Sequence, residues 1–343
     1  MLKLFTRMRR ILLVRTDRIG DVISITPSVR LLRQKFPDAH IAALVSAYAA
    51  PVLQDNHDIN EIITLGKIGE TSAEIKKRGF DTAVLFFVDR VSALTVWRAA
   101  IPLRIGPASK VWSLLLNKRI FQHRSQVLRH EADFNKDLLI PLGIEPVDSG
   151  VYINVPDYKA KWAEEFLSAQ SVTTGPRICI HAGSRGSAKD WPPKRFSELI
   201  ALLGREMPQA KIFTTGSADE AELVSGIIKN GGGRVCNLAG RLDLAQLIAV
   251  ISRMDVVVAN STGPLHIAAA TGVPTVSFFP RLKGCLPQRW GPYGKGHIVL
   301  MPPVSLCDTC DPDTCKQHQC MALIPAEEAF ESVRAQLETK VPA

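Results

Sequence analysis

Long apolar runs are missing from this 343-residue sequence: no stretch of 18 apolar residues occurs, so we expect no membrane-spanning helix. The motifs GxGxxG and GxxxxGKS/T are also missing, which argues against dinucleotide-dependent dehydrogenases and P-loop nucleotide-binding proteins. The start is basic and then apolar, but its apolar core covers only residues 11–14 and no small-residue cleavage site follows. We therefore interpret it as a first strand and expect a cytoplasmic protein.

Acidic residues are absent between Asp89 and Glu131, where Trp97, Trp112 and Phe121 occur. The basic residues of this segment are Arg90, Arg98, Arg104, Lys110, Lys118, Arg119, Arg124 and Arg129. The whole chain has a formal net charge of +9, so an anionic partner is plausible. The segment fits a solvated basic face as well as a surface for phosphate, carboxylate or anionic lipid.

Short apolar segments alternate with amphipathic helical patterns along almost the whole chain, and the alternation restarts after about residue 150. Strands are expected at 10–16, 39–46, 60–65, 81–87, 177–183, 211–217, 234–240, 255–260 and 274–279. Helices are expected at 21–36, 72–80, 193–207, 219–230 and 244–254. This pattern predicts an α/β protein of two doubly wound, Rossmann-like domains, 1–155 and 156–343. Parallel sheets bind ligands at the carboxyl ends of their strands, so we expect the active site in a central cleft between the domains.

One junction between an expected strand and helix lies at residues 260–264. Gly263 allows close approach of a ligand, Ser261 and Thr262 offer hydroxyl groups, and Pro264 suits a first helical turn. The free N–H groups of a helix start bind phosphate well. Ordinary helix capping would explain the serine and threonine equally well.

Two further junctions in the same domain carry polar residues. Gly183 and Ser184 begin a loop of small residues that ends in Lys189 and could wrap a diphosphate, with the lysine neutralising its charge. Glu220 follows the next strand, where a carboxylate can accept hydrogen bonds from ribose hydroxyls. Glu222 is a near competitor, and both acids could merely stabilise a helix start.

The first domain has a similar junction, in which Gly20 lets the backbone approach a ligand and Asp21 begins a helix. Asp21 could be a general base that removes a proton from an acceptor hydroxyl. A simple helix-start acid is the alternative.

Four motifs, "RTDRIGDVISITP", "HAGSRGSAKDWPPKRFSELI", "TGSADEAE" and "NSTGPLHIAAATGVPTVSFF", resemble family 9 glycosyltransferases, the lipopolysaccharide heptosyltransferases, over about residues 10–330. The resemblance implies a GT-B fold, an ADP-heptose donor, inversion at the anomeric carbon and catalysis without a metal or other cofactor. It also implies that Asp21 is the catalytic base and that Lys189 acts on the donor phosphates. The other implied donor contacts are Gly183, Ser184, Glu220, Ser261, Thr262, Gly263 and His266. Many members have an acid where this chain has Ser261, so the contact to the donor sugar is expected to be weaker and neutral.

The expected reaction is transfer of heptose to an anionic inner-core acceptor on lipid A, at the cytoplasmic face of the inner membrane. Domain 1–155 would bind the acceptor and domain 156–343 the nucleotide sugar, and no nucleic-acid partner is expected. The candidate acceptor-binding residues are Arg18, Gly20, Arg104, Lys118, Arg119 and Arg124. Alternatives are another nucleotide sugar, a protein acceptor, or a catalytically silent scaffold that binds nucleotide sugars.

The Cys-rich segment 307–320 precedes an expected terminal helix and contains Cys307, Cys310, Cys315 and Cys320. In a cytosolic protein this spacing favours a metal over disulfide bonds, and a structural zinc or iron site is one interpretation. The paired CxxC spacing of zinc sites is not met, so a thiol-rich loop without metal is the other.

Overall fold

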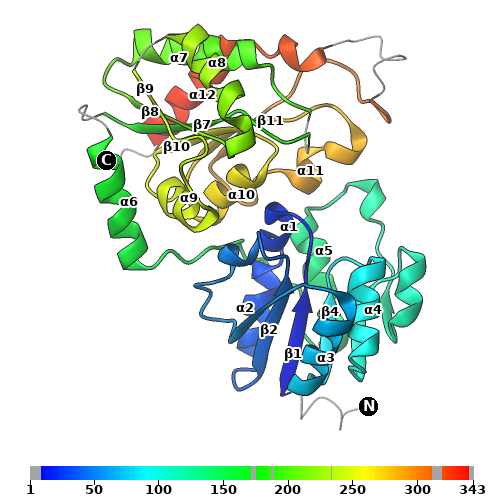
Figure 1. Ribbon diagram of the computed structural model, residues 1–343. Coiled ribbons are helices and arrows are strands. Elements are labelled where there is room, and N and C mark those ends of the chain that lie inside the picture. Colours follow the sequence, from blue (N-terminus) through cyan, green and yellow to red (C-terminus); the bar gives the residue numbers. More distant parts are fainter. Residues whose placement is uncertain (1–8, 171–174, 187–188, 233, 311–318, 340–343) are drawn as a thin grey trace. The chain divides into compact units, whose positions relative to one another are not determined.

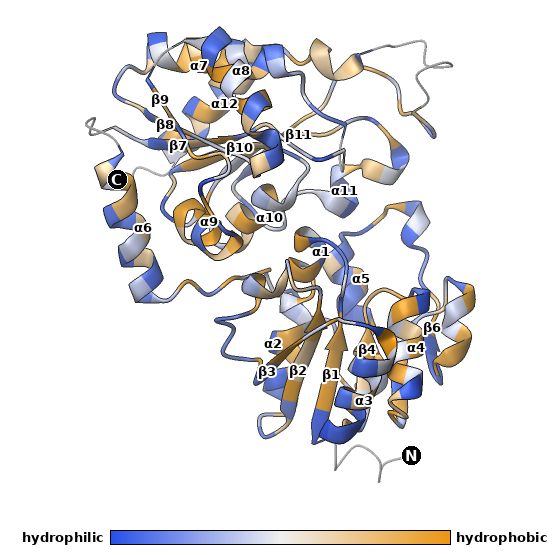
Figure 2. Cartoon of the chain, in the orientation of Figure 1, coloured by the Kyte–Doolittle hydropathy of each residue, from blue (hydrophilic) through white to orange (hydrophobic). Residues whose placement is uncertain are grey.

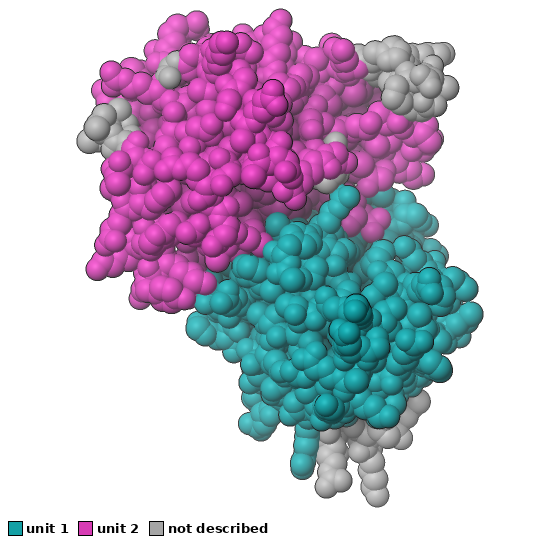
Figure 3. Space-filling model, viewed as in Figure 1, with its two compact units in different colours: residues 1–154 teal, residues 155–343 magenta. Residues whose placement is uncertain are grey.

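The structure is a computed structural model that describes residues 9–170, 175–186, 189–232, 234–310 and 319–339. The chain divides into two compact units, residues 1–154 and 155–343 (Figure 3). The expected domain boundary, after residue 155, lies next to this division. Within the described ranges, no helix has both the length and the apolar character needed to cross a bilayer.

Unit 1 is built on a six-stranded parallel sheet with the order β3-β2-β1-β4-β5-β6 (Figure 1). Its strands are β1 (Arg10–Val14), β2 (His40–Val45), β3 (Glu61–Thr64), β4 (Thr82–Leu85), β5 (Leu103–Pro107) and β6 (Lys118–Ile120). Its α-helices are α1 (Ile19–Ile23), α2 (Thr26–Lys35), α3 (Ile68–Arg78), α4 (Arg90–Arg98) and α5 (Glu131–Asp137). Short 3-10 turns are η2 (Ala50–Val52), η3 (Val111–Leu115), η4 (Arg124–Gln126) and η5 (Ile140–Leu142).

The central strand β1 is apolar on both faces because helices cover both faces of the sheet. Leu12 and Val14 pack in one cluster with side chains of α3 and α4. Ile11 and Leu13 point to the opposite face and are also fully buried. Figure 2 shows the same apolar concentration in β1, β2 and β4. In register, Leu12 lies beside Ala42 and Ala83, which sets the ends of neighbouring strands side by side.

The single helix expected at 21–36 is wrong, because the chain forms two helices, α1 and α2, in this region. Pro27 lies at the start of α2 and has no N–H to continue the hydrogen bonds of α1. The Thr26 hydroxyl instead donates to the Ile23 carbonyl at 2.8 Å. The break leaves α1 as a short helix that presents Asp21 just beyond the end of β1.

Unit 2 repeats the topology, with the strand order β12-β11-β10-β7-β8-β9. Its strands are β7 (Arg177–His181), β8 (Lys211–Thr215), β9 (Val235–Asn237), β10 (Val256–Asn260), β11 (Thr275–Phe278) and β12 (His297–Leu300). Its α-helices are α6 (Asp157–Ala169), α7 (Pro193–Glu206), α8 (Ala221–Gly231), α9 (Leu244–Ile251), α10 (Gly263–Ala270), α11 (Pro287–Trp290) and α12 (Ala326–Thr339). The 3-10 turns are η6 (Ala218–Glu220), η7 (Lys283–Cys285) and η8 (Cys320–Leu323). Helices α7, α8 and α12 pack on one face of the sheet and α9 and α10 on the other (Figure 1).

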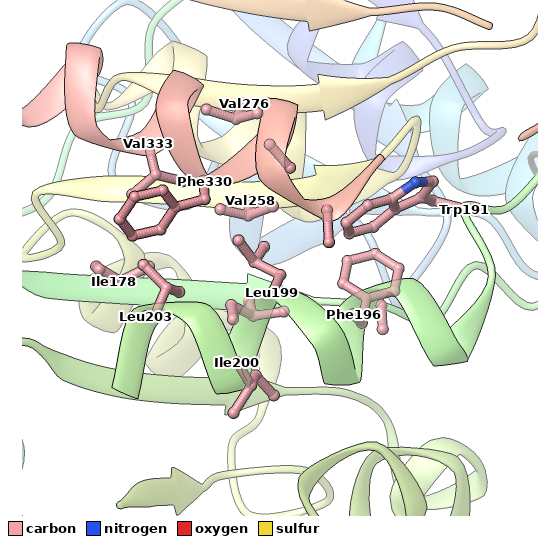
Figure 4. Packing of buried hydrophobic residues seen from close by; sticks show 14 of the residues in the cluster. Ile178, Trp191, Phe196, Leu199, Ile200, Leu203, Val258, Val276, Phe330 and Val333 are labelled. Atoms are coloured by element: carbon pink, nitrogen blue, oxygen red, sulfur yellow. The ribbon is translucent and has the colours of Figure 1, made fainter. Parts of the chain in front are cut away.

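The main core of unit 2 lies between its sheet and helices α7 and α12 (Figure 4). Trp191, fully buried, stacks on Phe278 with ring centroids 4.0 Å apart and meets the edge of Phe196 at 4.8 Å. Its indole N–H donates to the Ile324 carbonyl at 3.0 Å, so its one polar atom is satisfied in the apolar interior. Trp191 therefore anchors the end of the loop between β7 and α7.

Both sheets reverse their strand order at one point, between β1 and β4 in unit 1 and between β7 and β10 in unit 2. Doubly wound sheets bind ligands beyond the carboxyl ends of the strands at such reversal points. The structure thus confirms the predicted doubly wound α/β units. It also places residues 15–21 in one unit, and 182–186, 189–191 and 261–263 in the other, after the reversal-point strands.

Candidate functional site

In unit 1, the residue directly after β1 is Arg15, and its side chain is only 1% exposed. Its guanidinium contacts three carboxylates: Nε donates to Asp17 Oδ1 at 2.7 Å, Nη1 to Glu131 Oε1 at 3.3 Å, and Nη2 to Asp21 Oδ1. Nη1 also donates to the Phe86 carbonyl, at the end of β4. A buried guanidinium needs this number of acceptors, because an unpaired buried charge is strongly unfavourable. Arg15 therefore fixes three acids around the reversal point of the sheet.

Asp21 lies in the first turn of α1, and its side chain is 12% exposed. Arg15 holds Oδ1, whereas Oδ2 has no hydrogen-bond partner in the described part of the chain. A carboxylate with one oxygen fixed and the other accessible has the arrangement of an oriented general base. The helix-start alternative accounts for the position of Asp21 but not for its buried cationic partner.

Asp17 is the more exposed of the two acids, with 25% of its side chain accessible. Burial raises the pKa of Asp17 to about 6, with Arg15 opposing this rise and the charge of Asp21 adding to it. Tyr48 reaches the same loop, and its hydroxyl donates to the Asp17 carbonyl at 3.0 Å. Its own pKa is raised by burial and by the nearby charges of Asp17 and Asp21. Two acids and a tyrosine thus meet at the edge of the Arg15 group.

The structure corrects the expected exposure of two candidate acceptor-binding residues. Arg124 is 11% exposed, and its guanidinium pairs with Glu131 and donates to the Phe86 carbonyl at 3.2 Å. Arg104 donates from Nε to the Leu115 carbonyl at 2.9 Å and from Nη1 to the Ile101 carbonyl. Both guanidinium groups are therefore committed to contacts within unit 1. Sequence patterns could not distinguish them from Lys118 and Arg119, because most of their partners are backbone carbonyls, which any sequence offers.

Lys118, Arg119 and the candidate Arg18 are exposed, while Gly20 lies within α1. Lys118 and Arg119 lie on the edge strand β6.

The 3-10 turn η3 carries apolar side chains both on the side that faces the core and on the side that faces solvent. Residues three positions apart lie on the same side of such a turn. Trp112 and Leu115 pack on the core of unit 1, whereas Val111 and Leu114 are 70% and 68% exposed. Lys110 precedes the turn and lies 4.2 Å above the Phe87 ring, close to which Arg15 also lies. An exposed apolar and basic surface, which we define as Lys110, Val111, Leu114, Lys118 and Arg119, thus extends from the neighbourhood of Arg15.

In unit 2, Asn260 ends β10 and ties the two reversal-point strands together. It is fully buried, accepts from the Trp191 backbone N–H at 2.9 Å and donates to the Ala182 carbonyl at 2.7 Å. Both ends of the loop after β7 are thereby fixed by one neutral amide. Sequence reasoning missed Asn260, although a lone polar residue that ends an apolar strand was the available signal.

A second hydrogen bond, between a hydroxyl and a carboxyl group, also holds the loop after β7. Ser184 donates to Asp190 Oδ2 at 2.7 Å and accepts from the Gly186 N–H at 3.1 Å. Burial raises the pKa of Asp190, with the Ser184 hydrogen bond opposing it. Lys189 is exposed, and no ion pair of Lys189 occurs within the described ranges. Sequence reasoning also missed Asp190, which follows Lys189 and accepts the Ser184 hydrogen bond.

Glu220 lies against Gly183 and is part of a capping box. Its Oε2 accepts from the backbone N–H of Ser217 at 2.8 Å and from its hydroxyl at 3.0 Å. A Cβ at position 183 would lie only 2.1 Å from Glu220 Oε1, so a larger residue there would displace the Glu220 carboxylate. Burial alone would raise the pKa of Glu220, but hydrogen bonds from the Ser217 backbone and hydroxyl hold it below its usual range. The absence of a side chain at Gly183 thus leaves room for the Glu220 carboxylate beside the end of β7.

His181 ends β7 and is buried, with Nδ1 3.0 Å from the Thr215 hydroxyl. Burial lowers the pKa of His181 to about 4, with the charge of Glu220 opposing the shift. The imidazole is therefore neutral near pH 7. At this pH His181 is thus a polar but uncharged neighbour of Glu220.

Helix α10 begins directly after β10, with Thr262 as its N-cap and Pro264 in its first turn. The Thr262 hydroxyl donates to the Asn260 carbonyl at 3.2 Å and does not cap the helix. The first N–H groups of α10, from Gly263 onward, are thus left for a ligand by this side chain. Ser261 and His266 are half-buried at the same end. The ordinary capping alternative for Thr262 is therefore wrong.

The Cys-rich segment is described only in part, because Cys315 lies outside the described residues. Cys307 and Cys320 are half-buried and Cys310 is exposed. Among the described residues, no three His, Cys, Asp or Glu side chains are arranged to hold a metal ion. The metal site stays a prediction.

A family model described as glycosyltransferase family 9 (heptosyltransferase) matches residues 70–320, well over half of the chain. The chain belongs to glycosyltransferase family 9. It is therefore a glycosyltransferase, and the resemblance carried by the four sequence motifs is confirmed. Lipopolysaccharide heptosyltransferase 3 of Escherichia coli K12 is 25% identical over 341 residues, which cover 94% of this chain and 97% of the relative.

Solved structures of family 9 have the same fold. A glycosyl transferase family 9 structure from Veillonella parvula matches with a TM-score of 0.84 at 23% identity, covering 97% of this chain and 98% of that one. The E. coli ADP-heptose lipopolysaccharide heptosyltransferase II matches with a TM-score of 0.80 at 23% identity, covering 96% and 99%. These likenesses confirm the expected GT-B fold.

Proposed function

We propose that this family 9 enzyme transfers heptose from ADP-heptose to an anionic inner-core acceptor of lipopolysaccharide, with inversion at the anomeric carbon. In such a reaction an acceptor hydroxyl displaces ADP from the anomeric carbon in one step. This requires a base that removes the hydroxyl proton and groups that neutralise the charge of the leaving diphosphate. The observation that carries the proposal is the pair of groups at the two reversal points. Asp21, held by the buried Arg15, follows β1, and the start of α10, which the Thr262 side chain leaves uncapped, follows β10. Support also comes from the relatives whose names specify lipopolysaccharide heptosyl transfer.

Asp21 is the proposed base. Its free Oδ2 takes the proton of the acceptor hydroxyl while the hydroxyl oxygen forms a bond to the anomeric carbon. The bond from that carbon to the ADP oxygen breaks, and ADP leaves with both electrons of the bond. The oxygen enters opposite the departing ADP, so the configuration at the carbon inverts. Arg15 keeps Asp21 oriented, since it holds the other carboxylate oxygen.

Unit 2 is the proposed donor-binding unit. The N–H groups at the start of α10 and the charge of Lys189 stabilise the diphosphate as negative charge grows on it. Ser184, Gly183, Thr262 and Gly263 line the phosphate contacts, and Glu220 accepts from the ribose hydroxyls through the edge that Ser217 leaves free. Ser261 and His266 lie where the sugar would bind. This catalysis uses no metal or other cofactor.

Unit 1 is the proposed acceptor-binding unit, with Arg18 and Gly20 beside the base and Lys118 and Arg119 farther out. Its apolar and basic surface, defined above, would rest on anionic lipid at the cytoplasmic face of the inner membrane, with Val111 and Leu114 entering the headgroup region. Replacing Lys118 and Arg119 together by Ser should weaken binding to phosphatidylglycerol vesicles and raise the acceptor KM. The matched control replaces Lys76 and Lys77 on α3, and unchanged vesicle binding in the Lys118/Arg119 variant would limit the surface to a solvated face.

A donor and acceptor screen tests the reaction. ADP-heptose, UDP-sugars and GDP-sugars are each offered with lipopolysaccharides truncated at successive core positions, and products are identified by mass spectrometry. We expect a mass increase of one heptose only with ADP-heptose, and NMR of the product gives the anomeric configuration. Transfer from another nucleotide sugar, or to a protein, would favour those alternative functions. Donor binding without any turnover would favour a silent scaffold.

We also propose a structural iron or zinc bound by the cysteine-rich segment, since thiolates suit both metals. Protein purified without chelator should contain about one metal ion per chain by elemental analysis. Replacement of Cys307 and Cys310 by Ser should remove it, with replacement of Cys236 as the control. Metal-free wild-type protein of full stability would leave a thiol-rich loop as the explanation.

A further inference from the structure

The charged group around Arg15 contains one solvent-facing acid, Asp17, that the proposed reaction does not use. The same guanidinium binds Asp17 through Nε at 2.7 Å and Asp21 through Nη2. We propose that Asp17 is a positioning residue, which sets how strongly Arg15 holds Asp21 and thereby how readily Asp21 takes a proton. This inference rests on the proposed role of Asp21 as the base.

The remaining charges of the group favour this competition. Glu131, whose side chain is 2% exposed, is shared between Arg15 and Arg124. Arg124 therefore supplies much of the positive charge that Glu131 needs. Arg15 is left chiefly to Asp17 and Asp21. The group of two guanidiniums and three carboxylates has one negative charge in excess when all five are ionised. A negative Asp17 then draws Arg15 away from Asp21, whereas a neutral Asp17 leaves Arg15 to Asp21.

The other ionisable groups around Arg15 come from every neighbouring element. Arg15, Asp21 and Tyr48 act on Asp17 directly, and Arg18 acts on Tyr48. Glu131 in α5 and Arg124 in η4 belong to the same charged group through Arg15, and Lys110 lies over the Phe87 ring, close to which Arg15 also lies. Arginine and lysine stay charged in the range considered, and Tyr48 stays neutral because its pKa is raised. Asp17, whose pKa burial raises to about 6, is therefore the group that changes charge just below neutral pH.

The test is the pH profile of kcat/KM for Asp17→Asn, measured as ADP release from ADP-heptose with heptose-free truncated lipopolysaccharide. Removing one unit of negative charge beside Arg15 should move the acid limb of the profile about one pH unit lower. The plateau rate should fall roughly 3–10-fold, because a more firmly held carboxylate is a weaker base. The KM for ADP-heptose should not change. Asp17→Glu should restore the acid limb, since it restores the charge.

Two controls separate this effect from a loss of folding. Asp137→Asn removes a comparable acid of unit 1 that pairs with Arg129, and its profile should match the wild type. Asp17→Ser should give the same displaced limb as Asp17→Asn, although it packs differently. An acid limb that stays in place in both Asp17 variants overturns the proposal, even if turnover falls. A loss as large as that of Asp21→Asn also overturns it, because Asp17 would then be the base.

A second measurement needs no turnover. In protein labelled with carbon-13 at aspartate side chains, the Asp17 carboxyl should titrate near pH 6, as burial raises its pKa to about that value. Asp21→Asn should lower that midpoint, because coupling between two sites is reciprocal. An unmoved midpoint overturns the coupling and leaves the proposed function intact. Full turnover by Asp21→Asn would instead reject Asp21 as the base while leaving the titration result standing.

Discussion

The reversal points of the two sheets have the same topology and opposite chemistry. In unit 1 the loop after β1 is fixed by charge, since Arg15 and Arg124 hold Asp17, Asp21 and Glu131. In unit 2 the loop after β7 is fixed chiefly by hydrogen bonds of the neutral Asn260 and of the Ser184 hydroxyl.

The difference follows from what each unit is proposed to bind. A base must keep a defined charge and orientation, and buried counter-ions provide both. A diphosphate brings its own negative charge, so N–H groups and hydroxyls can bind it, while the carboxylates beside the loop after β7 are engaged by Ser184 and Ser217. The same strand order can therefore be adapted to either task by the residues that follow two strands.

The largest effect is expected from Asp21→Ala. Turnover should fall roughly 100-fold or more, because general base catalysis contributes about that much. ADP affinity, measured by calorimetry, should stay the same, since the ADP contacts are proposed to lie in unit 2. Asp137→Ala is the control. Near-normal turnover in Asp21→Ala would remove the base from unit 1 and with it the chemical division between the units.

Much of this comparison could be predicted from the sequence and part of it could not. The alternation of apolar strands and helices predicted both sheets, and glycine at 263 and the acid at 21 marked two of the junctions. The networks around Arg15 and Asn260 escaped prediction, because Glu131 and Arg15 are 116 positions apart and Trp191 and Asn260 are 69 apart. Arg124 was misplaced for another reason: its partner Glu131 is only seven residues away, but a basic residue looks alike in sequence whether it is solvated or paired.

Asn260→Ala should have the next largest effect. It leaves the Trp191 N–H and the Ala182 carbonyl unpaired inside unit 2, at a cost of about 2–4 kcal/mol in the free energy of unfolding. Because no charge is involved, the loss measured by urea unfolding should be equal at pH 6 and pH 8. The exposed Asn230 on α8, replaced by Ala, is the matched control. A strongly pH-dependent loss would show that unit 2 is also fixed by charge.

Lys189→Ala should have a smaller effect. Its exposed ammonium meets charge that exists in the donor and grows in the transition state, so both ADP affinity and turnover should fall, each by about 10-fold. Lys194→Ala on α7 is the control, since Lys194 is also exposed and its ammonium lies 3.9 Å from Glu198 Oε1. Equal weakening of ADP binding by Lys118→Ala would contradict the assignment of the donor to unit 2. An unchanged ADP affinity in Lys189→Ala would mean that this lysine points away from the diphosphate.

The smallest effects concern pH, and they should have opposite signs in the two units. Burial lowers the pKa of His181 to about 4, so between pH 4 and its ordinary value of 6.5 the folded state binds fewer protons than the unfolded state. The free energy of unfolding is therefore unaffected by His181 protonation above pH 6.5. It decreases as the pH falls below this value, by about 1 kcal/mol between pH 6.5 and 5.5. Asp17 has a raised pKa of about 6 instead of 3.8, so the folded state binds more protons between these values and stability falls as the pH rises through them.

Hydrogen exchange followed by mass spectrometry can read the two sheets separately, in peptides that contain β1 and β7. His181→Asn should remove the loss of protection of β7 at pH 5.5 and leave β1 unaffected. Asp17→Asn should increase the protection of β1 at pH 7, and this gain should fade toward pH 4. His57→Asn, at an exposed position of unit 1, should change neither. Opposite changes in protonation on folding give stabilities that change with pH in opposite directions. If both substitutions shifted protection in the same direction with pH, the contrast between the two reversal points would be wrong.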